Sequence, residues 1–362
     1  MNATLARDRG PALAEVGGWP AVLEALARRR DLTPHEASAA IRSILDGEAV
    51  PAQIAAFCVG LRIKGETVEE MTSLLDTLLA YGEAVEVPGG AEVVDTCGTG
   101  GDRRNTINVS TLAALVVAGS GGLVCKHGNR AATSASGSAD VLEALGVAID
   151  LGPAGVATCL DEAGMGFCFA PRYHAALRHA NPTRRELGIP TVFNFLGPLA
   201  NPARARRQAL GVSDPTMAEK VMGVLVAHGA IRALVVYGHD GLDELSTTTS
   251  SEVLELRHGE VRRYTVEPAE LGLPIADPDA LRGGDARANA EVVRRILDGE
   301  RGPQRDFVLL NAAAGVVAAG GADTLAEGLE VAAAAIDEGR AASVLERLVA
   351  VSQAEARALG VR

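Results

Sequence analysis

Apolar residues recur every three or four positions through the first part of the chain, a spacing typical of amphipathic helices. Four consecutive segments follow it, at residues 21–29 (AVLEALARR), 32–47 (LTPHEASAAIRSILDG), 50–65 (VPAQIAAFCVGLRIKG) and 67–82 (TVEEMTSLLDTLLAYG). Thr33 before Pro34 predicts an N-cap, and glycine closes each of the last three segments where a helix is expected to stop. Four helices without a strand predict a small helical domain over residues 18–88, after a flexible extension over residues 1–17.

From about Glu92 the pattern changes, because short β-like runs begin to alternate with helical segments. The runs lie at residues 93–95, 123–126, 166–170, 209–213 and 231–238. Such alternation is expected when helices connect neighbouring parallel strands. We therefore predict an α/β fold class: a small α-helical domain plus a larger α/β domain over residues 89–362, with a central, mostly parallel sheet flanked by helices.

The later part of this region carries clear start and stop signals. Pro215 begins a helical segment that Gly229 ends. A hairpin is predicted over residues 253–266 (VLELRHGEVRRYTV), with its turn at His258-Gly259. Beyond it, FVLLNAAAGVVAAGG and TLAEGLEVAAAAIDEG return to a helical pattern.

One segment interrupts the alternation of strands and helices. Residues 181–202 (NPTRRELGIPTVFNFLGPLANP) lack strand alternation and contain a short helix candidate around Arg184–Gly188. An inserted segment of this kind, near residues 176–205, could cross back to the helical domain. Its arginines would then face a cleft between domains, which is a favoured position for a ligand.

Composition narrows the class of protein. With 362 residues the chain exceeds the usual size of one domain, and its 48% hydrophobic but 3% aromatic content predicts a core of Ala, Val and Leu. A formal charge of -12 opposes nucleic acid or an anionic membrane as the main partner. Five cysteines without a CxxC pair oppose a disulfide scaffold or a structural zinc site. With no signal-peptide-like start and no apolar run of membrane-spanning length, we expect a cytoplasmic location.

The first candidate for chemistry is a glycine-rich turn in residues 93–102 (VVDTCGTGGD). Gly98, Gly100 and Gly101 can take positive φ and let backbone N–H groups approach an anion closely. Small hydroxyl and amide donors follow at the start of an apolar helix, at Thr106, Asn108, Ser110 and Thr111. The spacing fits neither a Walker A loop nor a dinucleotide fingerprint. The turn is thus phosphate-like, although by itself it also fits a plain strand-to-helix connection.

A second polar cluster, at residues 126–130 (KHGNR), strengthens the phosphate hypothesis because it supplies local positive charge in an acidic chain. Arg103 and Arg104 add to it, or are solvated surface charges. Cys97 is interpreted as a small packing residue, because the sequence specifies no neighbouring base. Asp243-Glu244 follow a strand end, where oxygen ligands for a hard cation are credible, but a solvated acidic pair is the simpler interpretation of the residues alone.

Five ordered motifs together resemble the anthranilate phosphoribosyltransferase family. They are DTCGTGGD, NTINVST, KHGNRAATSASGSADVLEALG, RRELGIPTVFNFLGPLANP and DGLDELS, and the resemblance runs from about Trp19 to the end of the chain. It implies a small helical domain with a larger α/β domain, and a homodimer. It also implies transfer of the 5-phosphoribosyl group from phosphoribosyl pyrophosphate (PRPP) to the amine of anthranilate, in tryptophan biosynthesis, with Mg²⁺ as cofactor.

The same resemblance implies roles for individual residues. Catalytic roles fall to Lys126, Asn129 and Arg184, and magnesium ligation to Ser110, Asp243 and Glu244. Anthranilate contacts match Gly98, Asn129 and Arg184, with His127, Tyr173 and His174 nearby. The substrate-binding residues implied as a whole are Gly98, Gly101, Asp102, Thr106, Asn108, Val109, Ser110, Thr111, Lys126, His127, Gly128, Asn129, Arg130, Ala131, Ala132, Thr133, Ser134, Ser138 and Arg184.

The chain departs from the family pattern at two places. Arg103 and Arg104 stand after GTGGD, where the family often has glycine, and Ala175 stands after His174, where it commonly has proline. The first departure bears on the geometry of the glycine turn, and the second on the path that leads to Arg184.

Two other functions stay open at this point. A pyrimidine nucleoside phosphorylase shares the general fold, but a KxSTGG-type phosphate loop would be expected in place of DTCGTGGD. A non-catalytic relative that binds nucleic acid should be basic on its binding face and could have lost the acidic pair, whereas this chain is acidic and keeps Asp243-Glu244.

Overall fold

The five parallel strands of this protein are mostly buried, as expected of strands that are covered on both faces. The computed structural model describes residues 12–101, 104–131, 135–358 and 360. The chain divides into two compact units. Unit 1 holds the chain up to Gly82 together with His174–Leu196, and unit 2 holds Glu83–Tyr173 and the chain from Gly197 onward.

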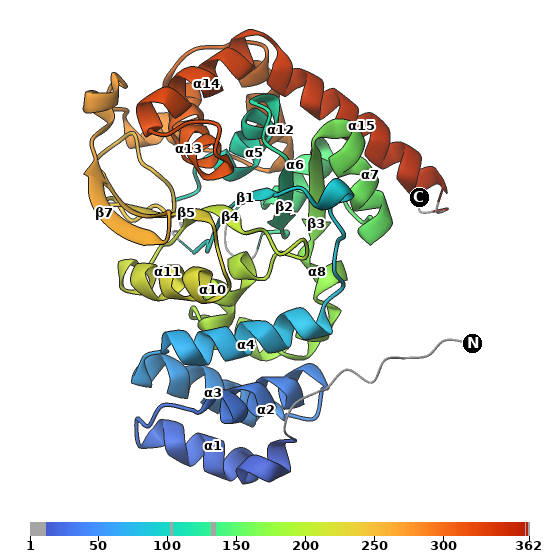
Figure 1. Ribbon diagram of the computed structural model, residues 1–362, viewed down its shortest axis with the longest axis vertical. Helices are drawn as coiled ribbons and strands as arrows, with labels where there is room; N and C mark the ends of the chain where they lie inside the picture. The colour runs from blue at the N-terminus through green and yellow to red at the C-terminus, as the bar shows by residue number, and fades with distance from the viewer. Residues whose placement is uncertain (1–11, 102–103, 132–134, 359, 361–362) are drawn as a thin grey trace. The chain divides into compact units, whose positions relative to one another are not determined.

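Unit 1 is helical (Figure 1). Its elements are η1 (Leu13–Val16), α1 (Gly18–Ala27), α2 (Pro34–Leu45), α3 (Pro51–Lys64), α4 (Val68–Tyr81), η3 (Ala175–His179), α9 (Asn181–Leu187) and the first part of α10 (Val192–Leu199). The expected extension over residues 1–17 lies largely outside the described residues, and η1 falls in its last part.

Local signals in the sequence account for the ends of these helices. The Thr33 hydroxyl accepts the N–H of Glu36, and the Glu36 carboxylate accepts the N–H of Thr33, which confirms the predicted cap of α2. Thr67 and Glu70 form the same capping box at α4. The inserted segment predicted near residues 176–205 belongs to this unit as far as Leu196, where α9 packs on α3 and η3 on α2, and its last residues belong to unit 2.

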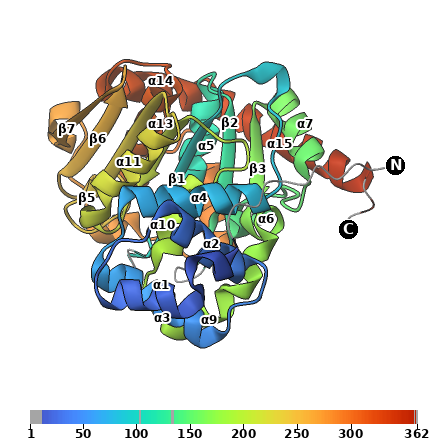
Figure 2. The ribbon, with the colours of Figure 1, turned by 60° about the horizontal axis from the view of Figure 1, so that its bottom comes forward.

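Unit 2 contains a seven-stranded sheet in the order β3-β2-β1-β4-β5-β6-β7 (Figure 2). The strands are β1 (Val94–Gly98), β2 (Val124–Gly128), β3 (Met165–Phe169), β4 (Arg207–Gly211), β5 (Arg232–Gly238), β6 (Ser251–Arg257) and β7 (Glu260–Val266). β1 to β5 are parallel, whereas β6 and β7 are antiparallel. The prediction of a mostly parallel sheet flanked by helices is confirmed.

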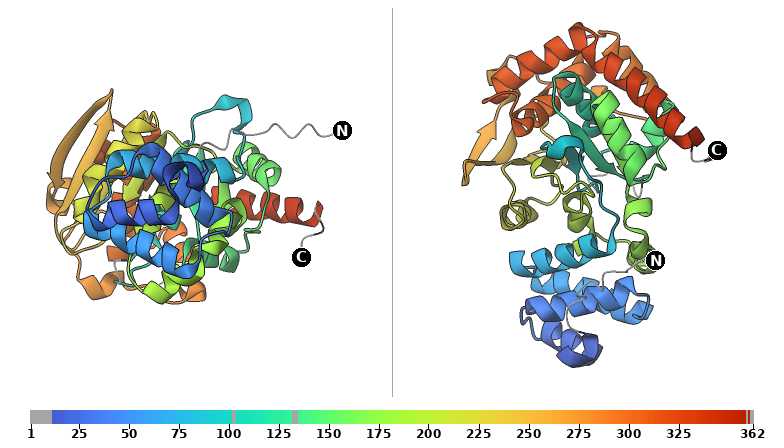
Figure 3. Two further views of the ribbon diagram at one scale, coloured as in Figure 1. Left: turned by 90° about the horizontal axis from the view of Figure 1, so that it is seen from below. Right: turned by 45° about the vertical axis from the view of Figure 1, so that its right-hand side comes forward.

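The predicted hairpin is also confirmed. It forms the edge of the sheet (Figure 3), and His258 and Gly259 both have positive φ at its turn, as a two-residue hairpin requires.

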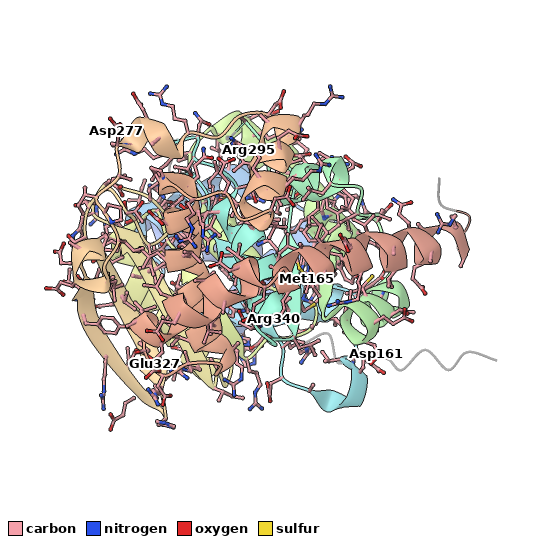
Figure 4. All side chains as sticks on the ribbon, turned by 90° about the horizontal axis from the view of Figure 1, so that it is seen from above. Asp161, Met165, Asp277, Arg295, Glu327 and Arg340 are labelled. Atoms are coloured by element: carbon pink, nitrogen blue, oxygen red, sulfur yellow. The ribbon has the colours of Figure 1, made fainter. Side chains whose placement is uncertain are left out.

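Helices cover both faces of the sheet. The helices of unit 2 are α5 (Val109–Gly119), α6 (Ser138–Ala144), α7 (Pro153–Ala163), α8 (Ala170–Tyr173), the end of α10, α11 (Ala218–Ala227), α12 (Ala286–Leu297), α13 (Pro303–Ala319), α14 (Leu325–Asp337) and α15 (Arg340–Ala358), with short helices η2 (Pro88–Gly90), η4 (Pro215–Met217), η5 (Pro268–Leu271) and η6 (Pro278–Leu281). The apolar helices α5 and α13 pack against each other and against β1, while α11 packs on β5 and β6. Figure 4 looks onto the covering helices, with Arg340 at the start of α15.

The covering of the sheet determines where ligands can bind. α5 is buried along almost its whole length, so the sheet face beneath it is closed by packing. The open positions therefore lie at the carboxyl ends of the parallel strands, where the loops begin. Within the described ranges, no helix is both long and apolar enough to cross a membrane.

Candidate active site

Four neighbouring parallel strands, β2, β1, β4 and β5, each end in glycine, at Gly128, Gly98, Gly211 and Gly238. The chain runs from β1 to one side of the sheet through β2 and to the other through β4, so β1 and β4 flank the point where the strand order reverses. Ligands of open α/β sheets favour that position.

A cavity of about 20 Å³ lies at this point, room for one water molecule or small cation. Its lining includes the three residues implied for magnesium, Ser110, Asp243 and Glu244, although they come from distant parts of the sequence. Thr96, Cys97, Gly211 and Asn311 line it too.

The glycine turn is held by side chains and backbone of unit 2. Gly100 and Gly101 have φ of 66° and 89°, as expected for an anion-binding turn, and the Gly100 N–H donates to a carboxylate oxygen of Asp243 at 2.7 Å. The Ser213 hydroxyl donates to the Gly100 carbonyl at 2.8 Å. Gly98 does not use positive φ. Its glycine is required by space, since an added Cβ would lie 3.1 Å from the Asp243 carboxyl carbon and closer still to an oxygen.

The Asp243-Glu244 pair lies in a loop fixed from two directions. From α13, the Asn311 side chain accepts the N–H of Leu245 and donates to its carbonyl, both at 2.9 Å. From the other side, the Arg104 guanidinium donates to the carbonyl of Asp240. The departure at Arg104 therefore ties the chain after the glycine turn to the acidic loop.

These residues fit a magnesium ion by their chemistry. A hydroxyl and two carboxylates facing one cavity are hard oxygen donors, and Mg²⁺ is usually held by one or two carboxylates together with substrate phosphates and water. Within the described residues no group of three or more His, Cys, Asp and Glu side chains is placed to hold a metal alone. The three oxygen donors at the cavity would leave other positions of an octahedral Mg²⁺ shell for phosphate and water.

The segment from Thr106 to Thr111 lies beside the turn and carries further implied contacts. Thr106 and Asn108 are half-buried, and the Asn108 N–H donates to the side chain of Asn289 at 3.3 Å. Ser110 is half-buried in the first turn of α5 and faces the cavity. Thr111 and Val109 are buried among the core side chains of α5, so contact with a ligand would come through their backbone.

Lys126 does not line the cavity but bonds to two residues that do. Its side chain is buried, 1% exposed, and its ammonium group donates to the carbonyl of Thr96 and to the Ser110 hydroxyl at 3.4 Å. Burial lowers the Lys126 pKa, opposed by the charge of Asp95. Burial also raises the pKa of Asp95 to about 6, opposed by Lys126, the Asn201 amide and the His127 N–H.

The loop after β2 carries the remaining implied contacts of unit 2. His127 is buried and its Nδ1 donates to the Gly197 carbonyl at 3.1 Å. Asn129 is exposed, and its carbonyl accepts a bond from the Ser138 hydroxyl at 3.3 Å. Arg130 forms ion pairs with Asp140 and Glu143, both at 2.8 Å. The two carboxylates therefore balance the charge of Arg130 within the fold.

The other implied residues of this loop are described in part. Gly128 is half-buried at the end of β2, where an added Cβ would lie 2.8 Å from the Phe167 ring, and Ala131 is exposed. Asp102, Arg103, Ala132, Thr133 and Ser134 lie outside the described residues.

Arg184 belongs to unit 1, in α9. It is half-buried, its guanidinium lies 5.2 Å from the centre of the Phe193 ring, and it donates to the Asn181 side chain at 3.1 Å. Its Nε has no hydrogen-bond partner, and within the described part of the chain no carboxylate pairs with it. Burial lowers its pKa. The arginine is thus held in place without its charge being neutralised.

Tyr173 and His174 have structural contacts within the fold. The Tyr173 hydroxyl is buried and donates to the carbonyl of Leu151 at 3.1 Å, and His174 is buried at the start of η3.

Burial and the charge of Asp95 raise the Cys97 pKa well above its ordinary value, so its thiol keeps its proton at neutral pH. This agrees with a packing role for Cys97.

Sequence reasoning missed several side chains that organise this site. They are buried or half-buried polar residues that fix the loops: Asp95, Asn201, Ser213, Asn289 and Asn311. Asp95 follows Val94 at the start of one motif and Asn201 stands between Ala200 and Pro202 in another, so a polar residue beside apolar ones was the available signal.

Known proteins resemble the chain over nearly its whole length. One family model, described as "Glycosyl transferase family, a/b domain", matches residues 90–342, and another, "Glycosyl transferase family, helical bundle domain", matches residues 20–82. Among curated relatives, the anthranilate phosphoribosyltransferase of Acidothermus cellulolyticus is 56% identical, over 94% of this chain and 97% of the relative. That of Arthrobacter sp. is 52% identical, over 92% and 96%.

Solved structures agree. Anthranilate phosphoribosyltransferase from Thermus thermophilus has a TM-score of 0.86 at 41% identity, covering 92% of this chain and 99% of that one. The Saccharomyces cerevisiae enzyme in complex with PRPP and Mg has a TM-score of 0.84 at 27% identity, covering 93% and 98%.

Proposed function

The chain belongs to the anthranilate phosphoribosyltransferase family, and we propose that it transfers the 5-phosphoribosyl group of PRPP to the amine of anthranilate, in tryptophan biosynthesis. The observation that carries the proposal is the meeting of Ser110, Asp243 and Glu244 at one cavity beside the glycine turn. This is the donor set that a magnesium-bound diphosphate needs.

The reaction breaks the bond between ribose C1 and the diphosphate oxygen and forms a bond from C1 to the anthranilate nitrogen. Charge develops on the leaving diphosphate, while the ribose approaches an oxocarbenium ion. Ser110, Asp243 and Glu244 would hold Mg²⁺, which would supply positive charge to the leaving diphosphate. The backbone N–H groups of the glycine turn and the polar groups of the loop after β2 bind the phosphates, as proposed from the family motifs.

Lys126 would contribute from the interior of unit 2. Its ammonium group is fixed by Thr96 and Ser110, so its charge costs no reorganisation when the leaving group forms. No covalent intermediate on the protein is required.

Arg184 is proposed to bind the carboxylate of anthranilate. Its guanidinium has no carboxylate partner in the described residues and is held over Phe193. A planar guanidinium recognises a carboxylate through charge-assisted hydrogen bonds, which would orient the amine for attack. We also propose that the protein acts in the cytoplasm as a homodimer, in line with the family resemblance, and light scattering coupled to gel filtration tests the dimer.

The decisive experiment mixes the purified protein with anthranilate, PRPP and Mg²⁺ and follows the loss of anthranilate fluorescence. We expect loss that depends on all three components. Phosphate-dependent cleavage of thymidine or uridine without PRPP, or no consumption of anthranilate, would contradict the proposal.

Variants of Arg184 test the acceptor site. Arg184→Ala should raise the KM for anthranilate roughly ten- to a hundredfold, the effect of about 1.5–3 kcal/mol for a lost charge-assisted bond. Arg184→Lys should recover part of this, because it keeps the charge but loses the planar fork. Arg185 is exposed on the same helix and serves as the matched control. An equal defect in Arg185→Ala would place the acceptor elsewhere.

A further inference from the structure

The ladder between β1 and β2 stops after its first rung. These strands pair at Val94–Val124, where the Val94 N–H donates to the Leu123 carbonyl at 2.9 Å. By contrast, β1 pairs with β4 at five positions along its length. If the parallel ladder continued, Thr96 of β1 would bond the Cys125 carbonyl and the His127 N–H of β2.

Side chains take the place of that second rung. The Asn201 amide donates to the Cys125 carbonyl at 2.8 Å, and the Asp95 carboxylate accepts the His127 N–H at 3.3 Å. The Thr96 carbonyl accepts a bond from the Lys126 ammonium group. We call the three side chains Asp95, Asn201 and Lys126 the side-chain rung.

The rung is built into the interior and is internally bonded. Asp95, Asn201 and Lys126 are 0%, 1% and 1% exposed. The Asn201 amide also donates to the Asp95 carboxylate at 2.7 Å, and its oxygen accepts the N–H of Ala203 at 2.8 Å. Both amide hydrogens of Asn201 and its amide oxygen are therefore committed, and these bonds fix the orientation of the side chain.

Joining two strands through such a rung costs more free energy than joining them through a backbone ladder. A plain backbone ladder satisfies the same peptide groups without burying a carboxylate and an ammonium group, and burial of an ion costs several kcal/mol before partners offset it. Stability therefore does not explain the arrangement. The geometric effect of the rung explains it instead, because two strands joined through side chains need not keep the backbone ladder spacing of about 4.8 Å.

The rung lies directly before the two proposed phosphate-binding loops. β1 ends at Gly98, two residues beyond Thr96, and β2 ends at Gly128, two residues beyond Lys126, so both loops begin directly after the rung. The separation of β1 and β2 at the rung thus sets the separation of these loops. We propose that Asp95 and Asn201 are positioning residues, which hold the glycine turn and the loop after β2 at the spacing that PRPP requires. This inference rests on the proposed function.

Two single variants test it. Asn201→Ala removes the donors to Cys125 and Asp95, and Asp95→Asn leaves one acceptor oxygen for two donors, the Asn201 amide and the His127 N–H. In both we expect calorimetry to show that PRPP, added with Mg²⁺, binds about tenfold or more weakly than to the parent protein. Ser352→Ala is the matched control, because Ser352 is also fully buried and bonded to a loop N–H, at Ala148, outside the site. It should lower the melting temperature and leave PRPP affinity unchanged.

A double variant separates positioning from loss of packing. Asp95→Asn with Asn201→Asp exchanges donor and acceptor between the two positions, so the bond between them returns while the one to Cys125 stays lost. We expect PRPP affinity in the double variant to lie closer to the parent than in either single variant. Losses that simply add would overturn the proposal.

Amide hydrogen exchange gives a readout that does not need substrate. Exchange in the peptide covering residues 124–130 should rise in both single variants, since the His127 N–H loses its partner or its fixed geometry. If the parent protein binds no PRPP, the proposed function fails while this measurement still tests the rung. Unchanged exchange in both variants, or raised exchange with unchanged PRPP affinity, would overturn the positioning role.

Discussion

Asn311 offers a sharp test of how the acidic loop is held, because a single side chain bonds both peptide groups of Leu245, the residue that follows Glu244. The Asn311 oxygen accepts the Leu245 N–H and its amide donates to the Leu245 carbonyl, each at 2.9 Å, and the amide also donates to the Phe307 carbonyl at 2.9 Å. We predict that Asn311→Ala raises the Mg²⁺ concentration needed for half-maximal PRPP binding.

The size of the effect follows from the two bonds to Leu245. Each contributes about 0.5–1.5 kcal/mol net, so losing both is worth about 1–3 kcal/mol. If the loop must be reordered whenever the metal binds, this corresponds to a rise of roughly five- to 150-fold in the Mg²⁺ requirement. Asn311 is half-buried, so water can replace part of the loss and favours the lower end.

Calorimetric titration of PRPP at a series of Mg²⁺ concentrations measures this directly. Asn311→Asp keeps the acceptor but loses the donor and should fall between the parent and Asn311→Ala. Gln353→Ala is the control, since Gln353 also joins a helix to a loop carbonyl, that of Gly146 at 2.8 Å, outside the site. If Asn311→Ala shows the parent's Mg²⁺ requirement while melting earlier, the clamp serves the fold and not the metal.

Three further outcomes are expected. Glu244→Gln should lower turnover strongly and raise the Mg²⁺ requirement with little change in melting temperature, and unaltered turnover at limiting Mg²⁺ would rule out its role as a ligand. Gly211→Ala should lower stability by about 1–3 kcal/mol and remove most activity, because the added methyl group overlaps the backbone carbonyl of Asp243. Gly155→Ala is the control in thermal melts and activity assays, since its added methyl group meets its nearest atoms at 3.4 Å. The Asp95 pKa is raised to about 6, and Lys126 is the charge that faces it, so near pH 5 the folded protein holds a proton that the unfolded chain releases. From pH 5 to 7.5 the parent should therefore lose about 1.4 kcal/mol of stability relative to Asp95→Asn. Denaturant titrations in which both proteins show the same pH dependence would contradict this.

Much of the fold could be predicted from the sequence, because its signals are local. Apolar runs bounded by glycine located all five parallel strands, and Thr33 and His258-Gly259 specified a helix cap and a hairpin turn that the structure confirms. Helix α10 was not predicted, because Gly197 and Pro198 inside it are breaking signals, and tertiary packing overrides them here.

The glycine turn shows both what the sequence predicts and where it misleads. Positive φ was expected of all three glycines, and Gly100 and Gly101 have it. Gly98 is glycine for another reason, the closeness of Asp243, which lies far away in the sequence. A single sequence does not reveal such a spatial requirement, since the neighbour that imposes it is brought there only by the sheet order.

The polar residues of the side-chain rung illustrate the same limit. Asp95 and Asn201 are 106 positions apart, and their pairing depends on a chain path from β3 back to β4 that passes through unit 1. The sequence implied Ser110, Asp243 and Glu244 as ligands because whole motifs resemble those of a family, and not because the spacing of these residues indicated a site. Their assignment as ligands stays a prediction that the experiments above address.

The divided composition of unit 1 has a consequence for how the protein is made on the ribosome. Residues up to Gly82 emerge first, but α9, which packs on α3, emerges only after β1, β2 and β3 have been synthesised. At about 5–20 residues per second, the interval between Gly82 and Leu196 is roughly 6 to 23 s. During it, the surface of α3 that α9 covers is exposed on the nascent chain. The first segment to be translated is therefore not the first to be completed, and early chaperone contact should concentrate there.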